Sequence, residues 1–141
     1  VAPPSLTLEI TESTLLFFDK AQHNIAELRK LGVGISIDDF GVGYSSLSMI
    51  KNIKVDELKI DRSFIKNALE NKRDRSILEG IIEIGKNIDS KVIVEGIETS
   101  EQLEFLIDKN INGQGYFYSK PLAVDDFINW YFTFYKAEKS S

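Results

Sequence analysis

The sequence contains no cysteine and a single histidine, His23. The lack of cysteine excludes disulfides, zinc–thiolate sites and thiol nucleophiles, and one histidine excludes a metal site built from several imidazoles. No apolar run reaches the roughly 18 residues of a membrane-spanning helix, and no signal-peptide pattern opens the chain. We therefore expect a cytoplasmic location, and a parent protein anchored in a membrane outside this chain would look the same here.

Positive charge is also scarce. The chain has 17 Lys and Arg against 22 Asp and Glu, a formal net charge of −5, and no basic block. A nucleic-acid polymer is therefore not an expected partner, whereas a small anionic ligand stays compatible because a bound metal reverses the local charge. The apolar content of 43% suffices for one domain with a real core.

Strand-like and helical segments alternate along the chain. Strands are predicted over residues 6–11, 33–38, 55–60, 92–95 and, weakly, 111–114. Helices are predicted over about residues 20–31, 47–50, 63–87, 100–109 and 124–135. Five βα units in series predict an α/β fold with a parallel sheet and helical crossovers. Residues 136–141 are predicted to form a loose C-terminal tail.

Local signals predict the ends of two of these helices and the buried face of a third. Asp19 is a candidate N-cap, with Gln22 at the capping-box position and Gly32 as the stop signal of the first helix. Thr99 is the candidate N-cap of the fourth helix. The long helical region carries apolar residues at helical spacing, which predict its buried face: Ile77, Ile81, Ile84 and Ile88.

The most informative segment is residues 37–47, which read IDDFGVGYSSL. An apolar, β-branched run ends there on two adjacent acids, Asp38 and Asp39, whose charges repel each other. A divalent cation would remove that penalty, because hard cations take oxygen ligands. A solvated acidic turn explains the pair equally well when the pair is taken alone.

Strand alternation connects Asp38 to acids elsewhere in the chain. Residues two apart share a face of a strand, and on four strands the apolar residues take one face while an ionisable residue takes the other. These ionisable residues are Glu9, Asp38, Lys59 and Glu95, and Asp39 and Asp61 lie alongside. In a βα barrel they would meet at the mouth, as a metal site with a positioned ammonium that suits phosphoryl chemistry. Scattered surface salt bridges are the competing interpretation.

Other features carry weaker signals. Gly41-x-Gly43, followed by Ser45, is compatible with a phosphate cradle and more often forms an ordinary turn. His23 lies among polar residues, as a solvated surface histidine does. The aromatic residues around Trp130 indicate packing first and a partner contact second.

Five motifs occur in order along the chain. They read LEITE at 8–12, DDFGVGYSSL at 38–47, KIDRSFI at 59–65, EGIET at 95–99, and QGY and SKP at 114–116 and 119–121. In this combination the chain closely resembles the EAL family, bacterial phosphodiesterases of cyclic di-GMP, over about residues 6–127. The resemblance implies hydrolysis of one phosphodiester bond of cyclic di-GMP to linear pGpG, with Mg²⁺ or Mn²⁺ as cofactor.

The same resemblance implies a role for each matched residue. Glu9 and Asp38 resemble ligands of a first metal. Asp38 would bridge to a second metal, with Asp39 as a ligand and Glu95 bound to it directly or through water. Lys59 would hold the attacking water, and Glu95 would assist the deprotonation of that water. Asp61 and Gln114 would position substrate or water. Glu12 resembles the anchor of a loop that takes part in dimer contacts in this family; of that loop we single out Phe40, Gly41, Gly43, Tyr44 and Ser45.

The chain departs from the family pattern in two places. The Glu-Ala-Leu tripeptide and an Asn-bearing motif, each of which supplies a ligand of the first metal, are absent and are expected upstream of Val1. The segment 110–113 before Gln114 also looks one residue short, and a one-residue slip would re-aim Gln114.

These departures define the expected domain organisation. A full βα barrel takes roughly 250 residues, so we interpret residues 1–135 as the C-terminal portion of one EAL domain, a partial TIM-type barrel of about five βα units. We expect the fragment alone to be inactive, the full domain to be a homodimer, and a sensory or diguanylate cyclase domain to lie upstream. The alternative is a degenerate EAL domain that binds cyclic di-GMP or a protein partner without hydrolysis. The retained acids favour the enzyme.

Overall fold

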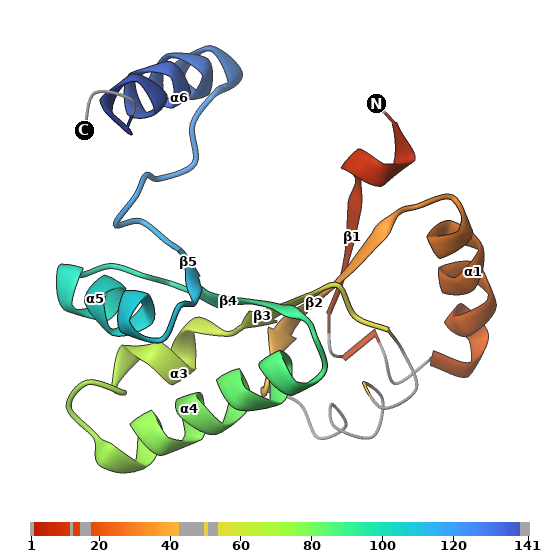
Figure 1. Cartoon of the computed structure of the whole chain (residues 1–141), viewed down its shortest axis with the longest axis horizontal. Coiled ribbons are helices and arrows are strands. Elements are labelled where there is room, and N and C mark those ends of the chain that lie inside the picture. The colour runs from red at the N-terminus through yellow and green to blue at the C-terminus, as the bar shows by residue number, and fades with distance from the viewer. Residues whose placement is uncertain (1, 12, 15–17, 43–49, 51–53, 139–141) are drawn as a thin grey trace.

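The computed structural model describes residues 2–11, 13–14, 18–42, 50 and 54–138. The elements follow in the order η1 (Pro3–Ser5), β1 (Thr7–Thr11), α1 (Phe18–Lys30), β2 (Gly34–Phe40), β3 (Glu57–Ile60), α3 (Arg62–Lys66), α4 (Lys72–Asn87), β4 (Lys91–Glu95), α5 (Ser100–Asp108), β5 (Asn112–Gln114) and α6 (Val124–Glu138). All strands pair in parallel, in the spatial order β1-β2-β3-β4-β5 (Figure 1). Each connection therefore advances by one strand, as in the wall of a βα barrel, and the α/β prediction is confirmed.

Two buried apolar clusters join the sheet to its helices. Residues of β2 and β3 such as Ile35, Ile37 and Leu58 form the first cluster with Ile25 of α1. The second cluster joins β3, β4 and the helices α3, α4 and α5; it includes Ile60, Ile65, Leu78, Ile82, Val94 and Leu106. Figure 1 shows α3, α4 and α5 gathered beside β3 and β4, whereas α6 lies apart at the end of residues 115–123. The opposite face of the sheet carries mostly polar side chains, with Ile93 of β4 as an apolar exception.

Strand β2 is longer than predicted and irregular near its end. Its register on β3 shifts between Ile37 and Phe40, and Asp39 has a left-handed backbone with φ of 56°. The side chain of Phe40 is 2% exposed and belongs to the same cluster as Ile37. Strict alternation would place residues 37 and 40 on opposite faces, so the extra residue of the bulge is what lets both enter the core.

Two predicted helix boundaries are wrong. Asp19 lies inside helix α1 and is therefore not its N-cap. The predicted single helix over 63–87 is two helices, α3 and α4, because Asn71 caps α4 by accepting hydrogen bonds from the backbone N–H groups of Arg73 and Asp74. The predicted short helix at 47–50 lies outside the described residues except for Ile50.

The buried face of α4 also differs from the prediction. Leu78, Ile82 and Gly85 are its buried residues, whereas Ile77 and Ile88 are 44% and 36% exposed. Ile81 and Ile84 flank the buried face. The helix is therefore rotated by about one residue from the predicted face, because Gly85 allows close approach to β4.

The remaining helices agree more closely with the sequence. Thr99 is the N-cap of α5, as predicted, and forms a reciprocal capping box with Gln102. Helix α6 continues to Glu138, so residues 136–138 of the predicted tail are helical. No helix among the described residues is long and apolar enough to cross a membrane.

Candidate functional site

Lys59 lies at the centre of the candidate site, on the polar face of β3. Its side chain is only 6% exposed, and its Nζ lies 2.8 Å from Glu95 Oε1, 3.2 Å from Glu9 Oε1 and 3.4 Å from Asp38 Oδ1. The three acids come from three other strands, β4, β1 and β2. The predicted convergence of these four residues is therefore confirmed, and their chemical roles remain predictions.

The surroundings of Lys59 keep its side chain charged. Burial by itself would lower the pKa of this lysine. Hydrogen bonds to Glu95 and Glu9, together with the charges of Glu95 and Asp38, outweigh burial and raise the pKa well above its ordinary value. Lys59 is consequently an ammonium ion at neutral pH, and it can donate hydrogen bonds but cannot accept a proton.

A second group of acids adjoins the ammonium. Asp38, Asp39 and Glu95 each offer a carboxylate oxygen, and these oxygens all lie within 4.8 Å of one another. Burial, followed by the charges of Asp38 and Asp61, raises the pKa of Asp39, while Lys59 partly offsets them. The bulge in β2 is what allows two residues adjacent in the chain to contribute to one cluster.

Glu9 and Asp61, both predicted as site residues, form contacts within the protein. Glu9, predicted as a metal ligand, points its carboxylate at Lys59. Asp61 caps α3, where its Oδ1 accepts a hydrogen bond of 2.9 Å from the Ser63 backbone N–H. Burial tends to raise the pKa of Asp61, but hydrogen bonds from Ser63 and Arg62 and the Arg62 charge lower it. Asp61 therefore stays ionised at the edge of the site, where its negative charge helps to raise the pKa of Asp39.

Gln114 lies beside Glu95 at the carboxyl edge of the sheet. Parallel pairing aligns Gln114 with Glu95, so the two side chains share a face despite the short segment that precedes Gln114. A hollow of about 200 Å³ adjoins both; it is lined by Arg62, Glu95, Gly96, Glu98, Gln114, Gly115 and Tyr116. The hollow offers space for a small ligand directly next to Glu95.

The remaining predicted site residues are structural or lie outside the described part of the chain. Phe40 is a core residue. Gly41 has φ of 98°, and a Cβ at this position would lie 2.7 Å from the Phe64 ring, so glycine is required for the turn after β2. Glu12, Gly43, Tyr44 and Ser45 lie outside the described residues.

A group of polar residues next to the site, Ser36, Glu57 and Lys91, was not predicted from the sequence. The Ser36 hydroxyl, fully buried, donates to Glu57 Oε1 over 3.3 Å, and Lys91 Nζ donates to Glu57 Oε2 over 3.1 Å. Ser36 and Glu57 precede Asp38 and Lys59 by two residues, so the same strand alternation predicts their shared face. Arg62, which lines the small hollow, was also missed, although it directly follows Asp61.

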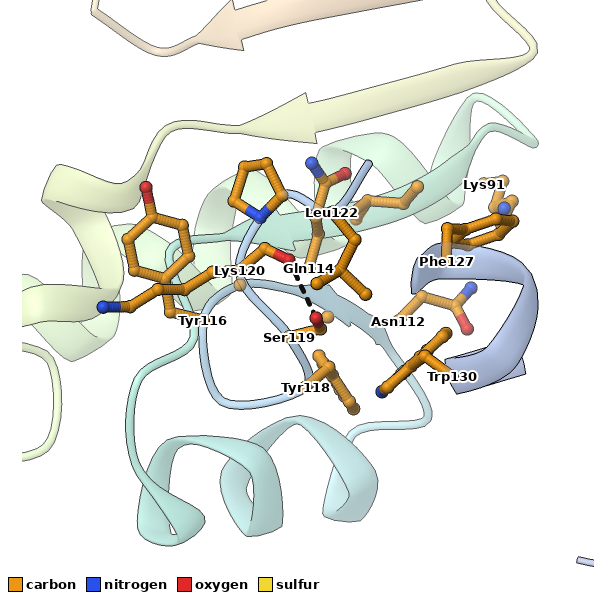
Figure 2. Close-up of a pocket in the computed structure, with 14 residues that line it drawn as sticks. Lys91, Asn112, Gln114, Tyr116, Tyr118, Ser119, Lys120, Leu122, Phe127 and Trp130 are labelled. Carbon is orange, nitrogen blue, oxygen red and sulfur yellow. Dashed lines mark hydrogen bonds between the residues drawn. The ribbon is translucent and has the colours of Figure 1, made fainter. Parts of the chain in front are cut away.

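A larger hollow shares Gln114, Gly115 and Tyr116 with the small one. It encloses about 630 Å³ between β4, β5, the segment after β5 and α6, and Figure 2 shows Phe127 and Trp130 of α6 on one side of it. Its described lining includes Lys91 and Lys120 and no carboxylate, so it does not extend the metal cluster. The Phe127 and Trp130 rings of α6 stack with their centroids 6.1 Å apart, and Phe127, Tyr131 and Phe132 are about half exposed. His23 is exposed, as predicted.

The fold and the site together define a class of protein: a parallel βα sheet whose carboxyl edge holds an acidic cluster around a buried ammonium. The family model described as EAL domain matches residues 1–121. The chain therefore belongs to the EAL domain family. Helix α6 lies beyond the matched residues.

Curated relatives share this segment within much longer chains. The chain is 43% identical over 127 residues to the oxygen sensor protein DosP of Escherichia coli, covering 89% of this chain and 16% of DosP. It is 42% identical over 131 residues to the cyclic di-GMP phosphodiesterase NbdA of Pseudomonas aeruginosa, covering 89% of this chain and 17% of NbdA. The chain thus spans about one sixth of the length of these relatives.

Solved structures show the same fold. The PaMucR phosphodiesterase in complex with c-di-GMP superposes with a TM-score of 0.83 at 40% identity, over 90% of this chain and 52% of that chain. The manganese and cyclic di-GMP complex of Klebsiella pneumoniae BlrP1 has a TM-score of 0.80 at 28% identity, over 86% of this chain and 31% of that chain. The five-stranded sheet is therefore part of an EAL barrel.

Proposed function

We propose that this chain is the C-terminal part of a metal-dependent phosphodiesterase that hydrolyses cyclic di-GMP to linear pGpG. The observation that carries the proposal is the buried Lys59 ammonium, which three carboxylates from three other strands hold at the carboxyl edge of the sheet. Two relatives support it: NbdA is named a cyclic di-GMP phosphodiesterase, and the PaMucR phosphodiesterase was solved with c-di-GMP.

Asp38, Asp39 and Glu95 are the residues that would hold a divalent cation. Their oxygens are close enough to share one ion, and an all-carboxylate set suits hard cations better than metals that prefer sulfur or imidazole. BlrP1 was solved with calcium and with manganese, which supports a divalent cation, and we propose Mg²⁺ or Mn²⁺ for this chain. A cation bound here would polarise the phosphate and lower the pKa of bound water.

The chain's own residues supply the remaining functions. Lys59 donates hydrogen bonds that orient the attacking water, because it stays protonated. Glu95, next to it, is the carboxylate that accepts the proton of this water. Glu9 holds the lysine in place from β1. Asp61 and Gln114 lie at the border of the site, where they position substrate or water.

The test requires the complete protein in which this chain occurs, because the chain covers 52% of the solved PaMucR chain. The protein is stripped of metal with a chelator, and pGpG release from cyclic di-GMP is followed by chromatography with and without added Mn²⁺. We expect release only with metal, and we expect Asp39→Asn to raise the Mn²⁺ concentration required. Asp108→Asn, at the exposed end of α5, is the control and should behave as the unaltered protein.

One result would favour the alternative function. If the protein binds cyclic di-GMP but releases no pGpG at any Mn²⁺ concentration, it is a non-catalytic binding module and the proposed hydrolysis is wrong.

Three further proposals concern the parent protein. DosP is named an oxygen sensor and MucR a bifunctional diguanylate cyclase/phosphodiesterase, which supports a sensory or cyclase domain outside this chain. We also propose a homodimer of the full domain, to be tested by its mass in light scattering. The 141-residue chain alone should release little or no pGpG, because two first-metal ligands of the EAL pattern are missing from it.

A further inference from the structure

Two sets of charges in the site share the same carboxylates. Lys59 Nζ contacts Glu9, Asp38 and Glu95. The acids that would hold a metal are Asp38, Asp39 and Glu95. Asp38 and Glu95 therefore belong to both sets. An ammonium ion and a divalent cation held by the same two carboxylates repel each other, so the two modes of binding compete.

The charges in the site explain why an ammonium is needed when no metal is bound. Four carboxylates gather there, from Glu9, Asp38, Asp39 and Glu95, and their mutual repulsion would push the strand ends apart. The Lys59 side chain is 6% exposed, so water has little access to the place that its charge occupies. Ion pairs to three strands make Lys59 the internal cation that holds the acids together.

We propose that Lys59 is an internal counter-ion, which occupies the carboxylate cluster in the metal-free protein and competes with the divalent cation for Asp38 and Glu95. The inference rests on the metal site of the proposed function. A divalent cation bound by Asp38, Asp39 and Glu95 would draw Asp38 and Glu95 away from the ammonium. Lys59 thereby weakens metal binding and makes it reversible, in addition to positioning water.

The test measures Mn²⁺ affinity, not activity. The complete protein and its variants are titrated with Mn²⁺, and free Mn²⁺ is followed by electron paramagnetic resonance. Lys59→Met removes the charge but keeps most of the apolar stem, and it should bind Mn²⁺ about tenfold more tightly or better, because a repelling charge is lost beside a divalent ion. Lys59→Arg keeps the charge and should bind Mn²⁺ about as weakly as the unaltered protein.

Lys91→Met is the matched control. Lys91 lies on the same face of the neighbouring strand β4 and is paired with Glu57, outside the carboxylate cluster. Its replacement removes an equal charge from the same side of the sheet, so it should leave Mn²⁺ affinity unchanged. A gain in affinity for Lys91→Met equal to that for Lys59→Met would mean that net charge alone is responsible, and would overturn the proposal.

Crystal structures of the unaltered protein with and without Mn²⁺ provide a second test that does not depend on a variant folding. We expect the 2.8 Å contact between Lys59 Nζ and Glu95 Oε1 to open when the metal binds. The proposal is overturned if Lys59→Met binds Mn²⁺ no more tightly, or if all three Lys59 contacts persist with metal bound. Failure of the unaltered protein and of every variant to bind Mn²⁺ would instead overturn the metal site of the proposed function, and this inference with it.

Discussion

Lys59 Nζ donates a hydrogen bond to Glu95 Oε1 over 2.8 Å and so links the carboxyl ends of neighbouring strands β3 and β4. Lys59 is aligned with Ile93 in the sheet, so Glu95 lies two residues further along its strand and on the same face. This offset places the pair at the mouth of the barrel wall. Without metal, the charged ammonium thus holds the carboxylate that we propose as proton acceptor.

Glu95→Gln tests this assignment in the complete protein. The change keeps the size of the side chain but removes its negative charge and its ability to accept a proton. We expect the rate of pGpG release to fall about 100-fold or more at saturating Mn²⁺. Glu57→Gln, which alters an acid on the same sheet face but outside the cluster, should retain activity within a few-fold. Near-normal turnover by Glu95→Gln would show that another group takes the proton.

Asp56 should make stability depend on pH. Its Oδ2 accepts hydrogen bonds from Arg29 over 2.6 Å and from the Ile35 backbone N–H over 2.8 Å. Burial tends to raise the pKa of Asp56, but the bonds from Arg29 and Ile35, and then the charges of Arg29 and Lys54, lower it below the ordinary value of 3.8. A lowered folded-state pKa stabilises the protein above pH 3.8, and this stabilisation is lost as the pH falls through the folded-state pKa.

Asp56→Asn should accordingly cost about 1–2 kcal/mol of unfolding free energy at pH 7, a modest amount because the pair is partly exposed. Urea unfolding at pH 7, 5 and 3 measures the difference from the unaltered protein. We expect the difference to be similar at pH 7 and 5 and smaller at pH 3. A difference that does not change with pH would mean that the Asp56 charge does not contribute.

Two glycines of α4 provide a matched pair for packing. A Cβ on Gly85 would overlap the Val92 side chain and lie 3.2 Å from Leu58 Cδ2, whereas a Cβ on Gly80 would meet nothing within 4 Å. We expect Gly85→Ala to destabilise the protein by about 1–3 kcal/mol through overpacking. Gly80→Ala should stabilise it by up to about 1 kcal/mol through helix propensity. Thermal unfolding compares them, and effects of the same sign would contradict the packing of α4 on β4.

The capping box of α5 should contribute to the stability of the segment that follows Glu95. The Thr99 hydroxyl accepts from the Gln102 N–H over 3.3 Å, and Gln102 Oε1 accepts from the Glu98 and Thr99 N–H groups. Thr99→Ala should cost about 1 kcal/mol in urea unfolding. Thr133→Ala is the control, because the Thr133 hydroxyl donates only to the Asn129 carbonyl within its own helix. An equal loss for both variants would argue against a capping role.

Strand alternation was sufficient to predict the centre of the site from the sequence. Glu9, Lys59 and Glu95 each lie opposite apolar neighbours on a strand, and parallel strands in sequential order bring their carboxyl ends to one edge. The motifs then identified the family correctly. Helix ends with strong local signals, such as Thr99 at α5, were also predictable, because a cap depends on residues a few positions apart.

Features that depend on burial were not predictable in this way. The bulge that turns Asp39 toward Asp38 exists because Phe40 enters the core, and the rotated face of α4 exists because Gly85 approaches Val92. The sequence by itself therefore determined the order of elements, the family and which charged residues share a face, since these follow from short-range periodicity. Only the tertiary structure decided that Asp38 and Glu95 serve both the ammonium and the candidate metal site, because distances between strands depend on how the whole sheet packs.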